Sequence, residues 1–466
     1  MISQRALRQW HRALGWFVGW QVVVWMMSGL YMSAAPIDWI HGDHWVHEDD
    51  RVLEDRPVLS LAALRTQFPT LTGFTLKSLA QQPVFEIRDS TGVQIIDAQT
   101  GDRLSPLLAD TVRALAQARF TGTQAVVSVD WLEHAPAEVS TRPAPLWRVT
   151  FAGAAKPTLY YSPETGELLA KRFAGWRLFD ALWMLHIMDY ATRSDVNNPL
   201  LRAAAGVGVL FAGSGLLLLI VARRRPRPGL RLPARPWPYR LHRGFAWAVG
   251  VQLILWIGSG LTMSLLDHSL VDGSRYARVP PSAAPIDLSS LLEPQQVLAR
   301  LGQPVRRLTL QSSPQGPFYL VQTADAVHRF DARTGAHAPV DAAAALAVAQ
   351  ADYLGSGQLQ TPEWLPQADQ ETRGHAGAFW RVPIDDSINS TLYVSADNGT
   401  VVERRNRIWR IFDVAWMLHI MDYRHRTSFN HPLLILMALG GIWLVGSGVW
   451  VAARRWRKES SARPAR

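Results

Sequence analysis

One fifteen-residue stretch occurs twice in this chain and restricts how the chain can fold. Residues 176–190 read WRLFDALWMLHIMDY and residues 409–423 read WRIFDVAWMLHIMDY, so twelve of fifteen positions are identical at an offset of 233. The apolar residues of each copy recur at helical spacing, which predicts a helix. Each copy places one histidine, His186 or His419, in its apolar middle. The fold must therefore contain two equivalent helices, each with a histidine among apolar side chains.

The duplication extends over the whole chain. Residues 11–33 align without gaps to residues 242–264, and parts of the intervening polar regions and the last apolar runs also match. The repeats are about 1–225 and 235–466. Each repeat contributes an apolar run, a soluble-looking region, the histidine helix and a second apolar run.

The four apolar runs are long enough to cross a membrane. The first, residues 12–34, has 23 residues, and at about 1.5 Å per residue such a run spans roughly the 30 Å hydrocarbon core of a bilayer. The first run also resembles a signal peptide with a small-residue cleavage site. Because the same run recurs in the middle of the chain, at 243–265, we interpret it as a retained span. Together the four runs predict an α-helical bundle of four spans.

The positive charge of the chain is concentrated beside these runs. The formal net charge is +10, but residues 1–12, 223–243 and 454–466 hold 17 Lys and Arg with one acid, whereas the rest has a net charge of −6. This is the positive-inside pattern, which predicts a multi-pass membrane protein with its basic segments and both termini cytoplasmic. The distribution does not favour a nucleic-acid partner. The absence of cysteine excludes disulfides, cysteine-ligated iron–sulfur clusters and covalently attached haem.

The regions between the spans alternate short β-branched and aromatic runs with turn residues, which predicts two small α+β domains outside the membrane. We expect seven segments, which are the first span and linker at 1–57, the first external domain at 58–170, the helix and second span at 171–225, the cytoplasmic linker at 226–240, the third span and linker at 241–279, the second external domain at 280–402, and the last helix, span and basic tail at 403–466.

Four histidines form two matched sets. Both repeats enter the membrane in the same direction, so a pseudo-twofold axis along the membrane normal relates them. That axis brings His11 near His242 on the inner side and His186 near His419 on the outer side. We call these the inner pair and the outer pair. Two facing imidazoles are the axial ligands that a b-type haem needs, so the sequence predicts two haem b groups.

Arg12 and Arg243 follow the inner histidines directly. We expect their guanidinium groups to pair with the propionates of the inner haem.

Plainer interpretations remain for several residues. An intramembrane histidine also serves as a hydrogen-bonded packing residue. Asp180 and Asp413 either hydrogen-bond near the outer site or cap their helix. Gln21 and Gln252 are expected to join helices, and Trp183 and Trp416 to pack.

Further histidines lie outside the matched pairs. His41, His44 and His47 have i, i+3, i+6 spacing, so neighbouring members would share a metal ion on a helix or else lie in a solvated loop. The second repeat has no equivalent of this set. His425 and His431 are additional candidates for the outer ligands.

Three motifs resemble a known family. The H-R-x-x-x-W start of the first span, the L-Y-x-S-x-x-x-G turn and the L-H-x-x-D helix occur in both repeats and look like those of the PepSY-associated transmembrane proteins. That family includes bacterial inner-membrane proteins that bind two b haems and reduce ferric siderophores in the periplasm. The resemblance implies PepSY-like domains at 58–170 and 280–402, and haem ligands at His11, His186, His242 and His419.

Some members of the family carry a cytoplasmic flavin- and NADPH-binding reductase domain, which this sequence does not show. The resemblance therefore implies a separate electron donor, which is a protein, a reduced flavin or quinol.

The leading hypothesis is a di-haem oxidoreductase of the ferric siderophore reductase type. The alternative is a membrane-anchored PepSY protein without catalytic activity that binds a peptide, a protease or a cell-envelope partner. A transporter, suggested by the repeats, ranks last because the cores of the spans lack acidic residues.

Overall fold

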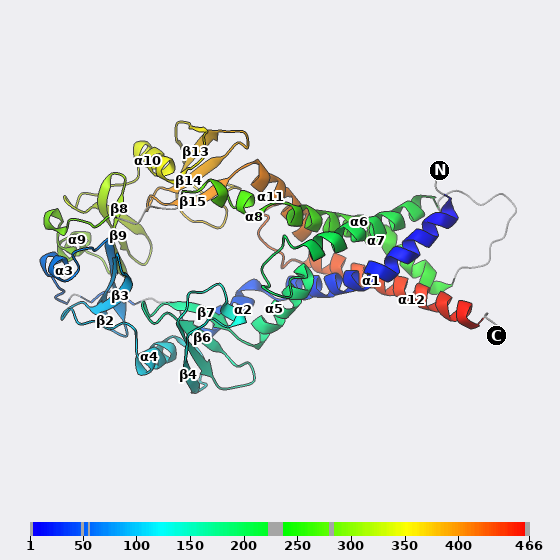
Figure 1. Ribbon diagram of the computed structural model, residues 1–466, viewed down its shortest axis with the longest axis horizontal. Helices are drawn as coiled ribbons and strands as arrows, with labels where there is room; N and C mark the ends of the chain where they lie inside the picture. Colours follow the sequence, from blue (N-terminus) through cyan, green and yellow to red (C-terminus); the bar gives the residue numbers. More distant parts are fainter. Residues whose placement is uncertain (1–2, 48–50, 55, 222–235, 279–283, 462–466) are drawn as a thin grey trace. The chain divides into compact units, whose positions relative to one another are not determined.

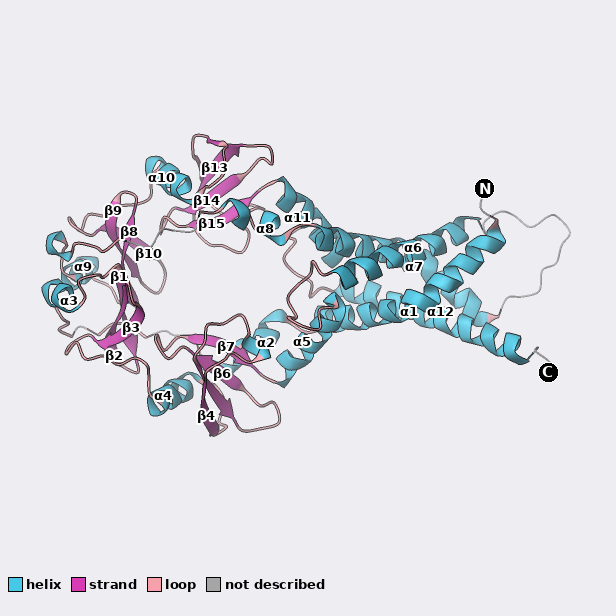
Figure 2. Ribbon diagram, in the orientation of Figure 1, coloured by secondary structure: helices cyan, strands magenta, loops and turns pink. Residues whose placement is uncertain are grey.

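The computed structural model describes residues 3–47, 51–54, 56–221, 236–278 and 284–461. Most of the predicted linker at 226–240 lies outside these residues. The chain divides into two compact units, and each unit takes segments from both repeats (Figures 1 and 2). The helical unit comprises Met1–Ile40, Leu178–Val271 and Ile408–Arg466, and the sheet unit comprises His41–Arg177 and Asp272–Arg407.

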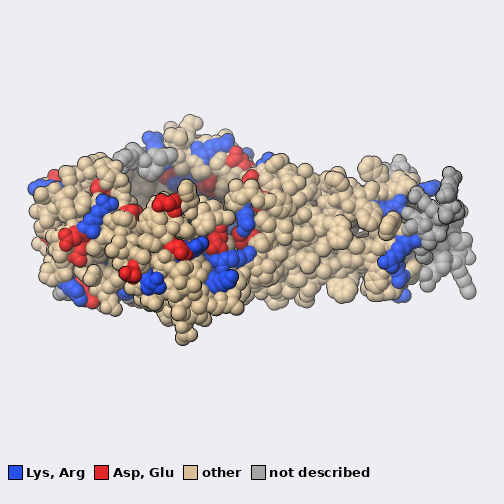
Figure 3. Space-filling view, turned by 60° about the horizontal axis from the view of Figure 1, so that its bottom comes forward, with Lys and Arg blue, Asp and Glu red and all other residues tan. Residues whose placement is uncertain are grey.

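The helical unit contains the four predicted spans, which are α1 (Gln4–Ala34), α6 (Pro199–Val221), α7 (Trp237–Leu265) and α12 (Pro432–Ser461). Among the described residues, these four helices are long and apolar enough to cross a membrane. Figure 3 shows a surface almost without charged side chains along the bundle, with Lys and Arg near the end where the chain termini lie. The prediction of a multi-pass membrane protein is confirmed.

Proline marks the start of three of these helices. Pro199 and Pro432 are the first residues of α6 and α12, and Pro238 lies in the first turn of α7. Proline suits this position because the first helical N–H groups have no partner within the helix. The side chain of Ser3 instead caps α1 by accepting a hydrogen bond from the backbone N–H of Ala6 at 3.1 Å.

The first span of each repeat packs against both second spans, because α1 and α7 each contact α6 and α12. The core of this bundle mixes the repeats, and its centre includes Val22 and Trp25 from α1 with Leu253 and Trp256 from α7. Two asparagines also join the repeats. The side-chain amide of Asn430 donates to the carbonyl oxygens of Met32, Ser33 and Ala35, and that of Asn197 donates to those of Ser264 and Leu266.

The predicted histidine helices are α5 (Ala174–Ile187) and α11 (Arg407–Ile420). Each ends one residue after its histidine, because Met188 and Met421 adopt positive φ angles of 55° and 58°. Two short helices, α2 (Ile37–His41) and α8 (His268–Val271), follow the first spans.

The sheet unit contains three sheets. The first has the order β10-β9-β8-β1-β2-β3, the second β4-β5-β6-β7, and the third β11-β13-β14-β15 with β12 also paired to β13. The strands of the first repeat are β1 (Gly73–Leu79), β2 (Gln82–Asp89), β3 (Gly92–Asp97), β4 (Val126–Leu132), β5 (Leu146–Phe151), β6 (Thr158–Tyr161) and β7 (Leu168–Arg172). Those of the second are β8 (Arg307–Ser313), β9 (Gly316–Gln322), β10 (Val327–Asp331), β11 (Gln358–Leu359), β12 (Glu363–Leu365), β13 (Phe379–Asp385), β14 (Thr391–Ser395) and β15 (Val401–Arg405).

The six-stranded sheet joins the two repeats. Strand β1 pairs antiparallel with β8, with Thr75 opposite Thr309 at a 3.2 Å contact between their hydroxyl oxygens. The apolar core beneath it also combines both repeats, with helix α3 (Leu61–Gln67) from the first and α9 (Pro294–Leu301) from the second. The α+β content agrees with the expectation. The shared sheet was not expected, because sequence regions 58–170 and 280–402 suggested two separate domains, whereas three strands of each lie in one hydrogen-bonded layer.

The other two sheets each belong to one repeat. Helix α4 (Ala109–Arg119) packs on β4 and β5, and α10 (Ala342–Asp352) packs on β13 and β14.

Candidate functional site

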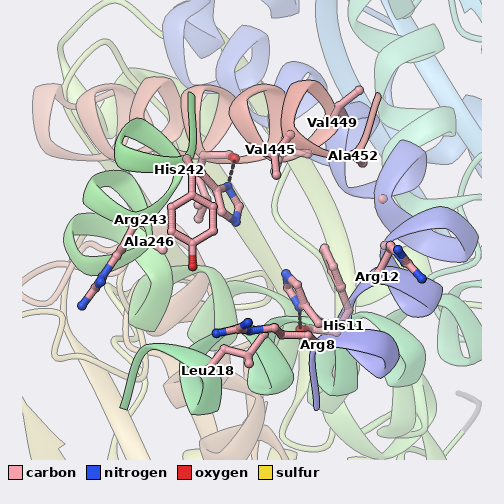
Figure 4. Close-up of a pocket in the computed structure, with 18 of the residues that line it drawn as sticks. Arg8, His11, Arg12, Leu218, His242, Arg243, Ala246, Val445, Val449 and Ala452 are labelled. Atoms are coloured by element: carbon pink, nitrogen blue, oxygen red, sulfur yellow. Dashed lines mark hydrogen bonds between the residues drawn. The ribbon is translucent and has the colours of Figure 1, made fainter. Parts of the chain in front are cut away.

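The structure brings the inner histidines together. His11 on α1 and His242 on α7 face each other, with their ring centroids 6.5 Å apart and their planes at 43°. Figure 4 shows the two rings entering one cavity from different helices. The pairing across repeats that the pseudo-twofold axis predicts is therefore present in the geometry.

The outer histidines also meet. His186 and His419 have ring centroids 6.1 Å apart and nearly perpendicular planes, at 86°. Each lies in the last turn of its helix, α5 or α11, and projects beside a first span of its own repeat. His186 contacts Ser28 of α1, and His419 contacts Ser259 of α7.

Every one of the four histidines has its Nδ1 atom hydrogen-bonded in the same way. A serine hydroxyl oxygen lies beside it, at 2.9 Å for Ser214 with His11, 3.4 Å for Ser447 with His242, 2.9 Å for Ser28 with His186 and 3.2 Å for Ser259 with His419. In three cases a backbone carbonyl oxygen is also within reach, from Phe211, Leu444 and Trp256. Such contacts by the distal ring nitrogen are what orient metal-binding histidines.

These contacts define the tautomer. Each serine hydroxyl donates its own proton to a carbonyl oxygen of its helix, for example Ser28 to Val24 at 2.7 Å and Ser447 to Leu444 at 2.9 Å. The hydroxyl oxygen must then accept from the histidine, so Nδ1 carries the proton. The Nε2 lone pair is left for a ligand. Among the described residues, the Nε2 atoms of the four histidines make no hydrogen bond.

A glycine follows each of these serines and gives the ring its space. A Cβ atom added to Gly215 or Gly448 would lie 3.0 Å from Cε1 of His11 or His242. At the outer pair the corresponding distances are 3.8 Å from Gly29 and 3.4 Å from Gly260. Since 3.0 Å is closer than carbon atoms pack, glycine is required most strongly at the inner pair.

The spacing of both pairs fits a metal bound between two imidazoles. Two metal–nitrogen bonds of about 2 Å and two nitrogen-to-centroid distances of about 1 Å place the ring centroids roughly 6 Å apart. The observed values of 6.1 and 6.5 Å agree with this separation. The donor set of four neutral imidazoles, with no thiolate in the chain, suits bis-histidine haem.

The inner pair lies in a cavity of about 1220 Å³, larger than the roughly 300–1,000 Å³ of ordinary small-molecule sites. Arg12 and Arg243, the expected propionate partners, both line it. Figure 4 shows their guanidinium groups extending away from the histidines, whereas that of Arg8 points into the space beside the two rings. In the sequence, Arg8 stood out only as one of the positive charges of residues 1–12.

Residues that match between the two repeats hold the turn that follows each histidine helix. Asp180 pairs with Arg193 at 2.5 Å, and the indole N–H of Trp183 donates to the carbonyl oxygen of the same arginine at 3.1 Å. Asp413 and Trp416 contact Arg426 in the same way. Of the two interpretations of Asp180 and Asp413, these ion pairs agree with hydrogen bonding near the outer site, because each arginine lies in the turn that follows a histidine helix.

The aspartates that follow the helices close the same turns. Asp189 accepts hydrogen bonds from Thr192 and from backbone N–H groups up to Asp195, and these bonds hold its pKa far below the usual range. For Asp422, burial acts to raise the pKa, but backbone N–H groups from His425, Ser428 and Thr427 outweigh it and lower the value.

The remaining candidates have structural partners. Gln21 and Gln252 donate to the carbonyl oxygens of Leu185 and Leu418, at 3.3 and 3.4 Å, and so join helices as expected. Both ring nitrogens of His431 are engaged, with the carbonyl oxygen of Ile420 and the backbone N–H of Leu434. That histidine therefore does the work that Asn198 does in the first repeat, bonding Ile187 and Leu201.

His41, His44 and His47 do not share one helix. His41 is the last residue of α2, His44 lies in a 3₁₀ turn, and His47 follows it. The His44 ring packs against Trp45 and Phe173, and burial lowers its pKa. Within the described part of the chain, no group of three or more His, Asp or Glu side chains is arranged to hold a metal ion.

Sequence reasoning missed the four serines. The signal was present, because a Ser-Gly dipeptide occurs once in each of the four spans, at 28–29, 214–215, 259–260 and 447–448. The dipeptide is read most easily as a helix-packing motif of small residues, and only the structure shows that each one faces a histidine.

One comparison with known proteins gives a match. The profile of the family described as PepSY-associated TM region matches residues 8–455, which is nearly the whole chain. A search of curated proteins found no match.

Proposed function

We propose that this chain, which belongs to the PepSY-associated TM region family, binds two b-type haems and carries electrons across the bacterial inner membrane. The acceptor we propose is ferric iron held by a siderophore or a similar chelate in the periplasm. Electrons enter from a donor on the cytoplasmic side.

One observation carries this proposal. Two pairs of neutral imidazoles face each other at 6.5 and 6.1 Å, each with Nδ1 held by its own Ser-Gly dipeptide and Nε2 left for a metal. Packing alone does not require this. A histidine that only joins helices is expected to use both ring nitrogens, as His431 does.

A haem held by the imidazoles of each pair would supply one-electron transfer. The part of the chain is to place the imidazoles, to exclude water and to set the strength of the ligands through their Nδ1 contacts. Helix α1 sets the distance between the pairs, because His11 and the Ser28 that contacts His186 lie seventeen residues apart on it. At about 1.5 Å per residue this is roughly 25 Å, most of the hydrocarbon core.

The acceptor is proposed from the family resemblance. A ferric chelate takes up one electron and becomes ferrous, which matches a one-electron carrier in stoichiometry. No catalytic acid or base is needed for this step, which is consistent with a site built only of ligands and their supports.

An absorbance spectrum of the purified protein tests the cofactor. We expect a Soret band and, after reduction, a b-type α band, with two haems per chain by a pyridine haemochrome assay. A colourless preparation from haem-replete cells would refute the proposal and favour a membrane-anchored binding protein.

A second experiment tests the acceptor. The protein is reduced with dithionite, desalted, and mixed with a ferric siderophore in the presence of a chromogenic ferrous chelator. We expect one ferrous complex for each haem that is reoxidised. Haem that stays reduced in the presence of several ferric chelates would exclude this acceptor class while leaving haem binding intact.

A further inference from the structure

The inner cavity is longer than the histidine pair needs. Along α1 its lining residues run from Gln4 to Trp20, so it continues from His11 in both directions. His11 lies seven residues after Gln4, which is roughly 10 Å along the helix. The lining of α12 likewise continues from Gly448, beside His242, to Trp456. We call the part of the cavity that begins at Arg8, beside the rings, and opens at the end of the bundle where the termini lie the mouth.

The mouth is cationic. Five arginines line the cavity, and among its described lining residues there is no Asp or Glu. These are Arg5, Arg8, Arg12, Arg243 and Arg454. Cations with low-dielectric walls and no acid between them attract an anion and raise its local concentration.

Arg8 is the cation best placed to contact a ligand. Its guanidinium points into the cavity beside the rings (Figure 4), and it makes no ion pair or hydrogen bond among the described residues. Arg8 has no counterpart in the second repeat, because the residue at the matching position there is Tyr239. Guanidinium binds phosphate oxygens through two parallel N–H donors.

Aromatic side chains line the cavity together with these arginines. They include Trp16, Tyr239 and Trp456, whose rings offer apolar faces to a flat ring system. The cavity therefore combines phosphate-binding cations with surfaces for a ring.

This chemistry separates the three donor classes. A quinol carries no charge that would use the arginines. A protein donor would dock outside the mouth and would leave the cavity of about 1220 Å³ to a smaller ligand. A flavin nucleotide has both a flat ring system and a phosphate.

We propose that the mouth of the inner cavity binds a flavin mononucleotide or a ligand of that class, with Arg8 contacting the phosphate. That such a ligand serves as the electron donor rests on the proposed function, whereas its binding does not. Anionic lipid is the other source of phosphate at this end of the bundle, and the experiment separates the two.

The test measures flavin fluorescence anisotropy with the purified full-length protein in nanodiscs of phosphatidylcholine. The probes are flavin mononucleotide and riboflavin, which has the same ring without the phosphate. The variant is Arg8→Gln. The matched control is Arg457→Gln, which removes one positive charge from the same end of the bundle at a residue outside the cavity lining.

We expect flavin mononucleotide to bind more tightly than riboflavin. Arg8→Gln weakens it by about tenfold, as for loss of a charge-assisted hydrogen-bonded contact, and Arg457→Gln leaves it unchanged. Equal affinity for the two probes, or an Arg8→Gln protein that binds as the native protein does, would overturn the proposal.

A lipid arm completes the experiment. Nanodiscs of phosphatidylglycerol replace those of phosphatidylcholine at constant ionic strength. Unchanged flavin affinity supports the proposal, and loss of flavin binding together with Arg8-dependent retention of phosphatidylglycerol assigns the site to a lipid headgroup. Haem content is measured on the same samples, so Arg8-dependent flavin binding by colourless protein would refute only the proposed function.

Discussion

The inner and outer histidine pairs use the same device in different surroundings. Each histidine is held by a Ser-Gly dipeptide, but the inner pair takes its dipeptides from α6 and α12 and the outer pair from α1 and α7. The inner pair opens into a cationic cavity. The outer pair lies at helix ends closed by Asp189 and Asp422. The inner pair is open to a cationic space, and the outer pair is held by the turns that end its helices.

The largest expected effect is loss of one haem. His186→Ala removes one ligand of the outer pair and should reduce the haem content by about half, because the inner pair keeps both imidazoles. A pyridine haemochrome assay normalised to protein measures this. The matched control is His431→Asn, which installs the residue of the first repeat and should keep both haems. Full haem content in His186→Ala would contradict the prediction that His186 and His419 hold one haem together.

The glycines sharpen the difference between the pairs. Gly448→Ala would place a Cβ atom 3.0 Å from the His242 ring, whereas Gly29→Ala leaves 3.8 Å to His186. Inner haem should be lost or its spectrum shifted in the first variant, at an overpacking cost of about 1–3 kcal/mol, and both haems should be kept in the second.

Gly446→Ala controls for helix effects, because an added Cβ meets nothing within 4 Å there. If Gly446→Ala and Gly448→Ala behave alike, the ring contact is not the cause.

Asp189→Asn tests how much the turn after α5 depends on the Asp189 carboxylate. The carboxylate accepts hydrogen bonds from the turn at 191–195. An amide has one acceptor oxygen fewer, so the free energy of unfolding should fall by about 1–2 kcal/mol. Because the pKa of Asp189 is depressed, its contribution is present above the unfolded value of about 3.9 and is lost only as pH falls further.

The native protein and the Asp189→Asn variant should therefore differ by a constant amount from pH 5 to 8. A difference that vanishes within that range would contradict the ionised carboxylate. Thermal melts followed by tryptophan fluorescence measure both quantities.

The smallest expected effect is on reduction potential. Among the described residues, Nδ1 of His186 contacts only Ser28, at 2.9 Å, whereas Nδ1 of His242 contacts the carbonyl oxygen of Leu444 at 3.0 Å and Ser447 at 3.4 Å. Removing the acceptor lowers ligand basicity and raises the potential. A bond worth about 1 kcal/mol corresponds to a shift on the order of 40 mV for a one-electron couple.

A spectroelectrochemical titration should show that shift for Ser28→Ala and a smaller one for Ser447→Ala. Equal shifts in the two variants would mean that the carbonyl oxygen does not compensate at the inner pair.

The sequence predicted the fold class and the identity of both histidine pairs. Repeats of matched direction imply a twofold relation, and that relation is enough to pair His11 with His242 and His186 with His419. Run length and charge were enough to place the four spans. These features depend on local composition and on symmetry, and both can be recognised in the amino-acid sequence alone.

The directions of side chains and the contacts between repeats were decided only by the tertiary structure. Arg8 points beside the inner rings because it precedes His11 by three residues and so lies on the same face of α1. Arg12 and Arg243 each directly follow a histidine, and adjacent positions on a helix do not face the same side. Strand β1 pairs with β8, over two hundred residues away. Each repeat has an edge strand with an apolar face, and pairing the two edges satisfies their backbone groups and buries both faces in one core. The amino-acid sequence by itself determined that the chain is duplicated, spans a membrane four times and carries two histidines per repeat. Only the fold decided that each histidine meets a Ser-Gly dipeptide, because that contact depends on how the helices pack.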